Sequence, residues 1–90
     1  MKIDELFDVI ENRVRNKKKH SYTNKLLKLG PKKIAQKLGE ETTELIIDYL
    51  NGSKKRTIEE AADVIYHLLV LLKSKKISLL EINKELSKRK

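Results

Sequence analysis

The sequence predicts a single all-α domain over residues 1–90, a bundle of about four main helices. Apolar residues recur at spacings of three and four along most of the chain, which is the period of an amphipathic helix. No segment alternates with the period of two that a half-buried strand requires. One proline and three glycines leave few residues for the turns of a β-sandwich. Ninety residues form only a modest core, so a homodimer is expected to complete the bundle.

The N-terminal third is predicted to hold one helix, a loop and a short helical turn. The helix covers residues 3–15, where five apolar residues share a face: Ile3, Leu6, Phe7, Ile10 and Val14. Residues 16–24 are polar and basic, and they are predicted to form a loop. A short turn of helix follows and ends at Gly30.

A long helix is predicted over residues 31–51. Pro31 opens it, because proline is tolerated at the first helical position. The Asn51-Gly52 pair is a helix stop, and residues 53–56 are predicted to form a basic link to the next helix.

Two further helices are predicted from capping boxes, in which a Ser or Thr is followed three residues later by Glu. The box at 57–60 starts a helix that runs from about 58 to 74. The box at 78–81 starts the last helix, 79–88, which ends in a frayed basic tail.

The charge of the chain is unevenly distributed. The formal net charge is +8, yet residues 40–63 hold seven acids against three bases and carry −4, so the rest carries +12. An acidic segment in a basic protein suits a polyanion held through metal ions at least as well as a phosphate backbone. Because no separate basic recognition helix is present, no nucleic-acid partner is expected. The absence of cysteine excludes disulfides, a thiolate zinc site and a cysteine nucleophile.

No membrane partner is expected either. The longest apolar run, residues 64–72, is too short to span a bilayer and is interrupted by His67. The N-terminus carries acids where a secretory signal would have its apolar segment, so the expected location is the cytoplasm.

The acids of the long helix do not form a simple outer face. On a helical wheel, four residues fall within roughly 60° of one another: Ile34, Leu38, Glu41 and Leu45. Glu41 therefore lies on the apolar stripe, with Asp48 close beside it and Glu44 about 60° away. Glu40 turns outward and is expected to be solvated.

The next helix repeats this pattern. Glu60, Asp63 and His67 form one line along the edge of its apolar arc. Each helix thus offers an acid pair, E-x-x-E at 41–44 and E-x-x-D at 60–63. Because the link between the two helices is short, they should pack antiparallel, with the pairs facing each other near the link.

Four carboxylates at a half-buried seam would repel one another and lose hydration. Either basic side chains or divalent cations must neutralise them. Oxygen ligands suit Mg²⁺, with Mn²⁺ as the alternative, and such ions activate water and neutralise charge on phosphates.

Each feature also has a plainer interpretation. A lone E-x-x-E on a charged helix usually faces solvent or pairs with lysine, but two such pairs on facing helices favour a metal site. A single histidine such as His67 is more often packed than a ligand, and Tyr66 is expected to pack. Lys37, one turn before Glu41, has two candidate roles, pairing with that acid or with a phosphate.

Three motifs give the chain a family resemblance: SYT-x-KL at 21–26, K-I-x-Q-K-x-G-E-E-x-x-E at 33–44 and E-A-A-D-x-x-Y-H at 60–67. From about residue 5 to 88 the chain resembles the phosphoribosyl-ATP pyrophosphatases of histidine biosynthesis, within the MazG-like all-α nucleotide pyrophosphohydrolases. The acid pairs are shared with the wider group. The other motif residues are typical of the histidine-pathway branch, although Thr42 and Thr43 stand where small or aliphatic residues are common.

The resemblance implies a Mg²⁺-dependent, homodimeric hydrolase that converts 1-(5-phosphoribosyl)-ATP to the AMP compound and pyrophosphate. It implies catalytic and metal-binding roles for Glu41, Glu44, Glu60 and Asp63, with Glu40 as an auxiliary ligand. The candidate substrate-binding residues are Ser21, Tyr22, Thr23, Lys25, Lys33 and Lys37, with His67 as a seventh. No cyclohydrolase activity is expected. The alternative is a house-cleaning pyrophosphohydrolase of ordinary or damaged nucleotides, which would use the same acids.

Overall fold

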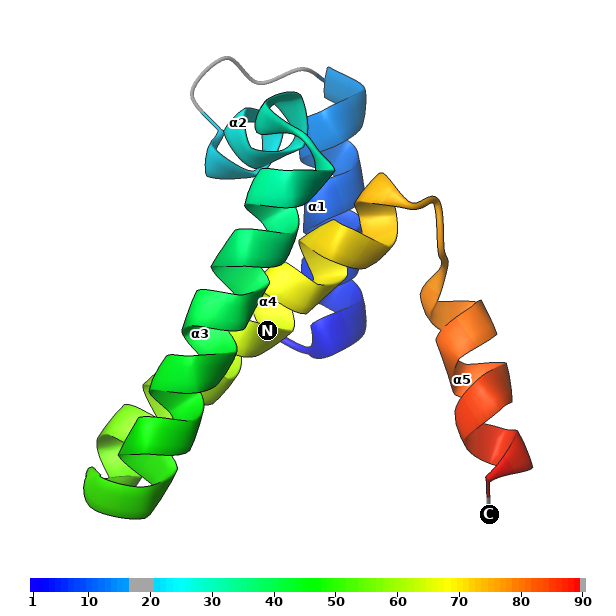
Figure 1. Cartoon of the computed structure of the whole chain (residues 1–90). Helices are drawn as coiled ribbons and strands as arrows, with labels where there is room; N and C mark the ends of the chain where they lie inside the picture. Colours follow the sequence, from blue (N-terminus) through cyan, green and yellow to red (C-terminus); the bar gives the residue numbers. More distant parts are fainter. Residues whose placement is uncertain (17–20, 90) are drawn as a thin grey trace.

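The computed structural model describes residues 1–16 and 21–89, which form five α-helices and no strand (Figure 1). The helices are α1 (Ile3–Asn16), α2 (Tyr22–Leu29), α3 (Pro31–Asn51), α4 (Lys54–Ser74) and α5 (Leu79–Lys88). The all-α prediction is confirmed, with five helices in place of four main ones. The extra helix is α2, which was predicted only as a short turn. Residues 17–20 of the predicted loop, and Lys90 of the tail, lie outside the described residues.

Helix α2 starts earlier than predicted because Ser21 caps it. The Ser21 side chain accepts a hydrogen bond from the backbone N–H of Asn24, which satisfies one of the free donors of the first turn. The Asn24 side-chain amide donates to the carbonyl of Arg13 at 2.9 Å and so ties α2 to the end of α1. The prediction of a loop was therefore wrong for residues 22–24.

The start of α4 also differs from the prediction. Ser53 is the N-cap, and its hydroxyl oxygen accepts from the backbone N–H of Arg56 at 3.1 Å. Thr57, the predicted cap, lies inside the first turn and donates to the Ser53 carbonyl. The predicted basic link thus forms the first helical turn, because Ser53 also caps and lysine and arginine are good helix formers. The predicted bounds of α3 and α5 are confirmed, including the Ser78 cap.

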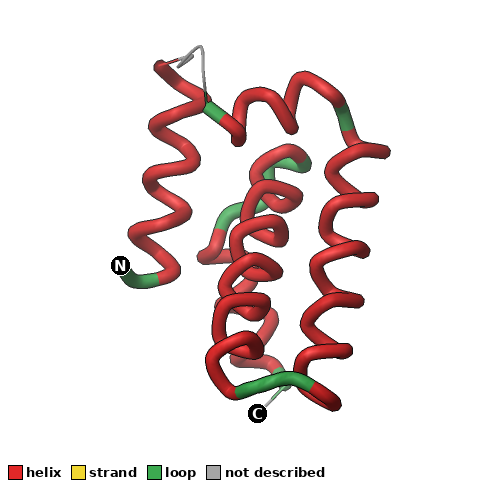
Figure 2. Tube along the Cα trace, turned by 90° about the vertical axis from the view of Figure 1, so that its left-hand side faces the viewer, coloured by secondary structure: helices red, strands yellow, loops and turns green. Residues whose placement is uncertain are grey.

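Helices α3 and α4 form a long hairpin. We call the half of the hairpin that holds the α3–α4 turn its outer half and the opposite end its inner end. Helices α1 and α2 cover only the inner end (Figures 1 and 2). The core lies at that end and contains seven buried apolar residues: Phe7, Ile10, Leu26, Ile34, Leu69, Val70 and Leu72. From residue 35 to residue 66, all described by the structure, Glu60 is the one fully buried residue. The outer half of the hairpin therefore has a carboxylate where a core residue would stand.

Helix α5 stands away from the outer half of the hairpin (Figure 1). Ile77, Leu79 and Ile82 pack against the edge of the core. The Cα radius of gyration is 14.1 Å, larger than the roughly 12 Å of a compact domain of this length. No helix in the described part of the chain is long and apolar enough to cross a membrane. The open arrangement of the helices leaves large apolar side chains exposed to solvent.

The α3–α4 turn requires glycine at position 52. A Cβ there would lie 2.7 Å from Asp48 Oδ1 and 2.9 Å from the Asp48 carbonyl oxygen, whereas a Cβ on Gly39 would meet open space. We expect Gly52→Ala to lower the free energy of unfolding by about 1–3 kcal/mol through overpacking. Gly39→Ala, inside α3, should raise it by up to about 1 kcal/mol. Urea unfolding of both variants measures this, and equal effects would contradict the close turn.

Candidate functional site

Three acids predicted from sequence meet across the hairpin. Glu41 of α3 and Glu60 and Asp63 of α4 each offer one carboxylate oxygen, and the three oxygens lie within 4.8 Å of one another. Exposure increases outward through this acid cluster. Glu60 is 4% exposed, the Glu41 side chain is 13% exposed, and Asp63 faces solvent. The cluster therefore has a closed inner side and an open outer side.

The two oxygens of Glu60 have different surroundings. Oε1 accepts a hydrogen bond from Arg56 Nη2 at 2.6 Å. Oε2 is buried, and no described residue donates to it. A buried carboxylate oxygen without a partner is costly, because it has lost its hydration. Burial, together with the nearby Glu44 carboxylate, raises the pKa of Glu60, and Arg56 opposes this. The site is thus short of positive charge on the Oε2 side.

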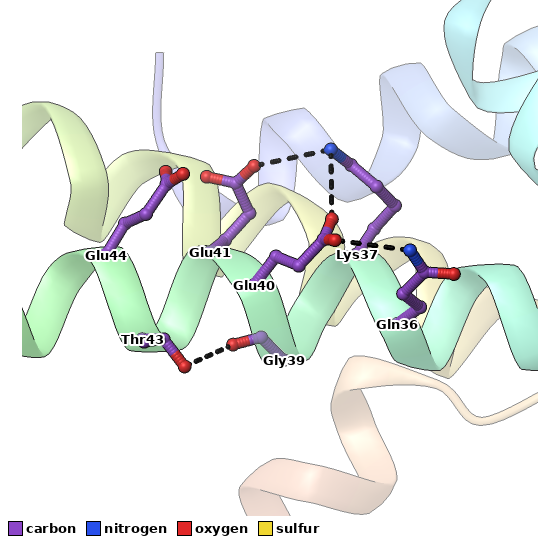
Figure 3. Close-up of a pocket in the computed structure, with 7 residues that line it drawn as sticks. All are labelled: Gln36, Lys37, Gly39, Glu40, Glu41, Thr43 and Glu44. Atoms are coloured by element: carbon purple, nitrogen blue, oxygen red, sulfur yellow. Dashed lines mark hydrogen bonds and ion pairs between the residues drawn. The ribbon is translucent and has the colours of Figure 1, made fainter.

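The side chains of Glu44 and Glu40 point in different directions from α3, as the helical wheel predicted. Glu44 lies near Glu60, and its carboxylate projects from the same side of α3 as that of Glu41 (Figure 3). It is exposed and lies at the rim, outside the acid cluster. Glu40 turns outward, accepts from Gln36 at 3.2 Å and pairs with Lys37 at 3.6 Å. The Gln36 hydrogen bond, with Lys37, lowers the pKa of Glu40.

Lys37 occupies the first of its two predicted roles. Its Nζ lies 3.7 Å from Glu41 Oε1, so it pairs with an acid of the cluster (Figure 3). The nearby Tyr22, followed by Glu40 and Glu41, raises the pKa of Lys37. This ammonium group brings positive charge to the open side of the cluster.

An open pocket of about 680 Å³ runs along this face of α3 (Figure 3). It is lined by Gln36, Lys37, Gly39, Glu40, Glu41, Thr43 and Glu44. Of the predicted metal-binding acids, Glu41, Glu44 and the auxiliary Glu40 line the pocket, whereas Glu60 and Asp63 do not. A ligand in this groove would therefore reach the acids from the α3 side.

A hydrogen-bonded network joins α2 to α4 beside the acids. His67 Nδ1 lies 2.7 Å from the Asp63 carbonyl oxygen, which can only accept, so Nδ1 carries the hydrogen. In the neutral ring, Nε2 then accepts from the Tyr22 hydroxyl at 3.1 Å. Thr23 Oγ1 hydrogen-bonds Tyr66, whose ring stacks on Tyr22 with centroids 6.0 Å apart. Burial raises the pKa of Tyr22, and Lys37 opposes this.

The predicted substrate-binding residues fall into two groups. Ser21 caps α2, while Thr23 and His67 are buried and hydrogen-bonded to protein groups. The structure thus shows these three in roles that hold α2 in place. The others reach the surface: Tyr22 and Lys25 are exposed, and Lys33 and Lys37 are half-buried. Their contact with substrate stays a prediction.

Known proteins resemble this chain over almost its whole length. Residues 3–90 match the phosphoribosyl-ATP pyrophosphohydrolase family. Proteins named phosphoribosyl-ATP pyrophosphatase are 48% identical in Clostridium novyi, over 98% of this chain and 80% of that protein, and 51% identical in Clostridium acetobutylicum, over 97% and 79%. The one from Sulfolobus acidocaldarius is 45% identical over 97% of this chain and 92% of its own. The chain belongs to the phosphoribosyl-ATP pyrophosphohydrolase family.

Sequence reasoning missed one residue at this candidate site. Arg56 was assigned to the basic link, but in the structure it contacts Glu59, Glu60 and Asp48. Asp48, which the wheel placed beside Glu41, pairs with Arg56 at 3.8 Å and is not part of the acid cluster. Arg56 precedes Glu59 and Glu60 by three and four residues, a spacing that predicts ion pairs on a helix. The spacing indicates these pairs only if α4 is known to begin at residue 54.

The Tyr22–His67 contact can be tested through stability. Tyr22→Phe removes the hydroxyl and leaves Nε2 of a buried histidine without its donor, so we expect a loss of about 1–2 kcal/mol in the free energy of unfolding. The control is Ser74→Ala, because it removes an exposed hydroxyl at the end of α4, and its change should stay within about 0.5 kcal/mol. Chemical denaturation followed by circular dichroism compares the two. Equal losses would show that the network does not hold α2.

Proposed function

We propose that the protein is a Mg²⁺-dependent phosphoribosyl-ATP pyrophosphatase of the cytoplasm. It hydrolyses 1-(5-phosphoribosyl)-ATP to the corresponding AMP compound and pyrophosphate, a step of histidine biosynthesis. Family membership supports the substrate and the reaction. The observation that carries the metal is the buried Glu60, whose Oε2 has no described partner and which belongs to a cluster of three acids.

The residues of the acid cluster fit a hard divalent cation. Glu41, Glu60 and Asp63 offer only carboxylate oxygens, the donors that Mg²⁺ and Mn²⁺ prefer. A cation there would give Glu60 Oε2 the partner that it lacks and would offset the repulsion among the acids. Glu44, beside Glu60 at the rim, completes the set of four that the sequence predicted. Glu40 pairs with Lys37 and Gln36, so we leave it out of the ligand set.

The charges around the site support a cation for this substrate. A triphosphate is itself strongly negative, and four carboxylates would repel it. A bound Mg²⁺ supplies the positive charge that neutralises phosphate oxygens and helps to activate a water molecule. The phosphates would reach the cluster from its exposed side, at Asp63, with Glu44 at the rim. Lys37, 3.7 Å from Glu41, is placed to pair with a phosphate oxygen that arrives there.

A house-cleaning nucleotide pyrophosphohydrolase remains the alternative, because it would use the same acids. Family membership favours phosphoribosyl-ATP over ordinary nucleotides. The two functions separate by substrate: phosphoribosyl-ATP assayed beside a panel of deoxynucleoside triphosphates should be hydrolysed in strong preference to all of them. Equal or faster hydrolysis of the panel would support the alternative.

Glu41 and Glu40 form a matched pair for testing the metal ligands. They are adjacent on α3 and both contact Lys37, but only Glu41 belongs to the acid cluster. Glu41→Gln should lower turnover of phosphoribosyl-ATP and weaken Mn²⁺ binding by about 100-fold or more, because a charged ligand is lost. Glu40→Gln should change both by only a few-fold. If Glu40→Gln caused the larger loss while both variants kept a native helical spectrum, the assignment would be wrong.

A homodimer is part of the same proposal. The outer half of the hairpin exposes five large apolar residues: Ile46, Ile47, Tyr49, Leu50 and Ile58. Helix α5 exposes Leu80 and Leu86, and it stands apart from the hairpin. Two apolar faces on so small and open a chain favour a second copy as the partner, since each copy offers the same surfaces in a two-fold pair.

The oligomeric state provides a direct test. Light scattering should give the wild-type protein a mass of about twice the 10.5 kDa of one chain. Leu50→Lys should shift it toward the monomer, because a charge would be placed in the proposed interface. Leu29→Lys is the control, since Leu29 is also exposed but lies on α2. A monomeric wild type at micromolar concentration, or equal effects of both lysines, would refute this interface.

A further inference from the structure

Arg56 holds one oxygen of the buried Glu60. It lies in the first turn of α4, where its backbone N–H donates to the Ser53 cap. Its guanidinium reaches three carboxylates: Glu60 Oε1 at 2.6 Å, Glu59 Oε1 at 2.9 Å and Asp48 Oδ2 at 3.8 Å. The first contact occupies Oε1, and Oε2 is left as the free oxygen of Glu60. The side chain that fixes Glu60 is therefore itself held from both helices of the hairpin.

Asp48 is placed to anchor Arg56. Its side chain is 22% exposed at the end of α3, and Gly52 leaves the space that its carboxylate occupies. Thr57 Oγ1 lies 3.3 Å from the Asp48 carbonyl, and Gly52 N–H donates to that carbonyl at 2.8 Å. These contacts fix the backbone around Asp48. Its carboxylate faces Arg56 and stays outside the acid cluster.

Arg56 has two opposite effects on the binding of a cation at the acid cluster. Its positive charge repels a cation, but its side chain is 55% exposed, and solvent screens such a charge. Its hydrogen bond reaches a carboxylate that is almost fully buried, where charge-assisted hydrogen bonds are strong and directional. Orientation of Glu60 should therefore outweigh repulsion.

We propose that Arg56 is a positioning residue for the cation site: it holds Glu60 by Oε1, leaves Oε2 free for the cation, and is anchored by Asp48 across the hairpin. This inference rests on the metal site of the proposed function. It gives Asp48 and Arg56 a shared role outside the ligand set. Groups that orient ligands in this way commonly change metal affinity by 10–100-fold when they are removed.

The test is a titration of the full chain with Mn²⁺, without substrate, in which electron paramagnetic resonance measures the free ion. Arg56→Gln should weaken Mn²⁺ binding by about 10-fold. Arg56→Lys should also weaken it, because an ammonium group cannot span the separate carboxylates as a guanidinium does. Asp48→Asn should weaken it less, and should add nothing once Arg56 is already Gln, because the two residues act as one unit.

Lys37→Gln is the charge-matched control, because it removes the same charge next to Glu41. It should not weaken Mn²⁺ binding. The inference is overturned if Arg56→Gln binds Mn²⁺ as tightly as the wild type or more tightly, if the Asp48 and Arg56 effects simply add, or if Lys37→Gln weakens binding equally. A wild-type protein that binds no Mn²⁺ would instead refute the metal site itself. Thermal unfolding without metal confirms that each variant is folded.

Discussion

The buried carboxylate of Glu60 is the constraint on which the outer half of this molecule depends. The apolar core lies at the inner end of the α3–α4 hairpin, and beyond it Glu60 is the fully buried residue between positions 35 and 66. A charge at such a position needs compensation from each side. Arg56 supplies it to Oε1, and we propose that a cation supplies it to Oε2 and to the acid cluster. The hairpin is thus organised around charge where a bundle would normally have leucines.

The rest of the fold serves to hold that charged region in place. The core fixes the crossing of α1 and α2 on the inner hairpin, and the Tyr22–His67 hydrogen bond carries this order to the backbone of Asp63. The same network places α2, with the exposed Tyr22, beside Lys37 and the groove on α3. Two residues that the family resemblance associated with substrate, Tyr22 and His67, therefore connect the core to the acids, and His67 does so from a buried position.

Much of this arrangement could be predicted from the sequence, for identifiable reasons. Helical periodicity with Pro31 and Gly52 gave the bounds of α3, and the wheel correctly separated Glu41 from Glu40. The start of α4 was missed because Ser53 and Thr57 are both good caps, and local pattern does not choose between them. The role of Asp48 was missed because a wheel gives direction around one helix but not the reach of Arg56 from the next. The exposure of α5 depends on tertiary packing, which helical periodicity in the sequence does not predict.

The central claim is that Glu60 is buried in order to bind a cation together with Glu41 and Asp63. Crystals grown with Mn²⁺ and measured at a wavelength where manganese scatters anomalously test it most directly. The account predicts an anomalous peak at bonding distance from Glu60 Oε2 and from carboxylate oxygens of Glu41 and Asp63, with Arg56 still on Oε1. The absence of a peak there at saturating Mn²⁺, with a protein group bonded to Oε2 in its place, would contradict it.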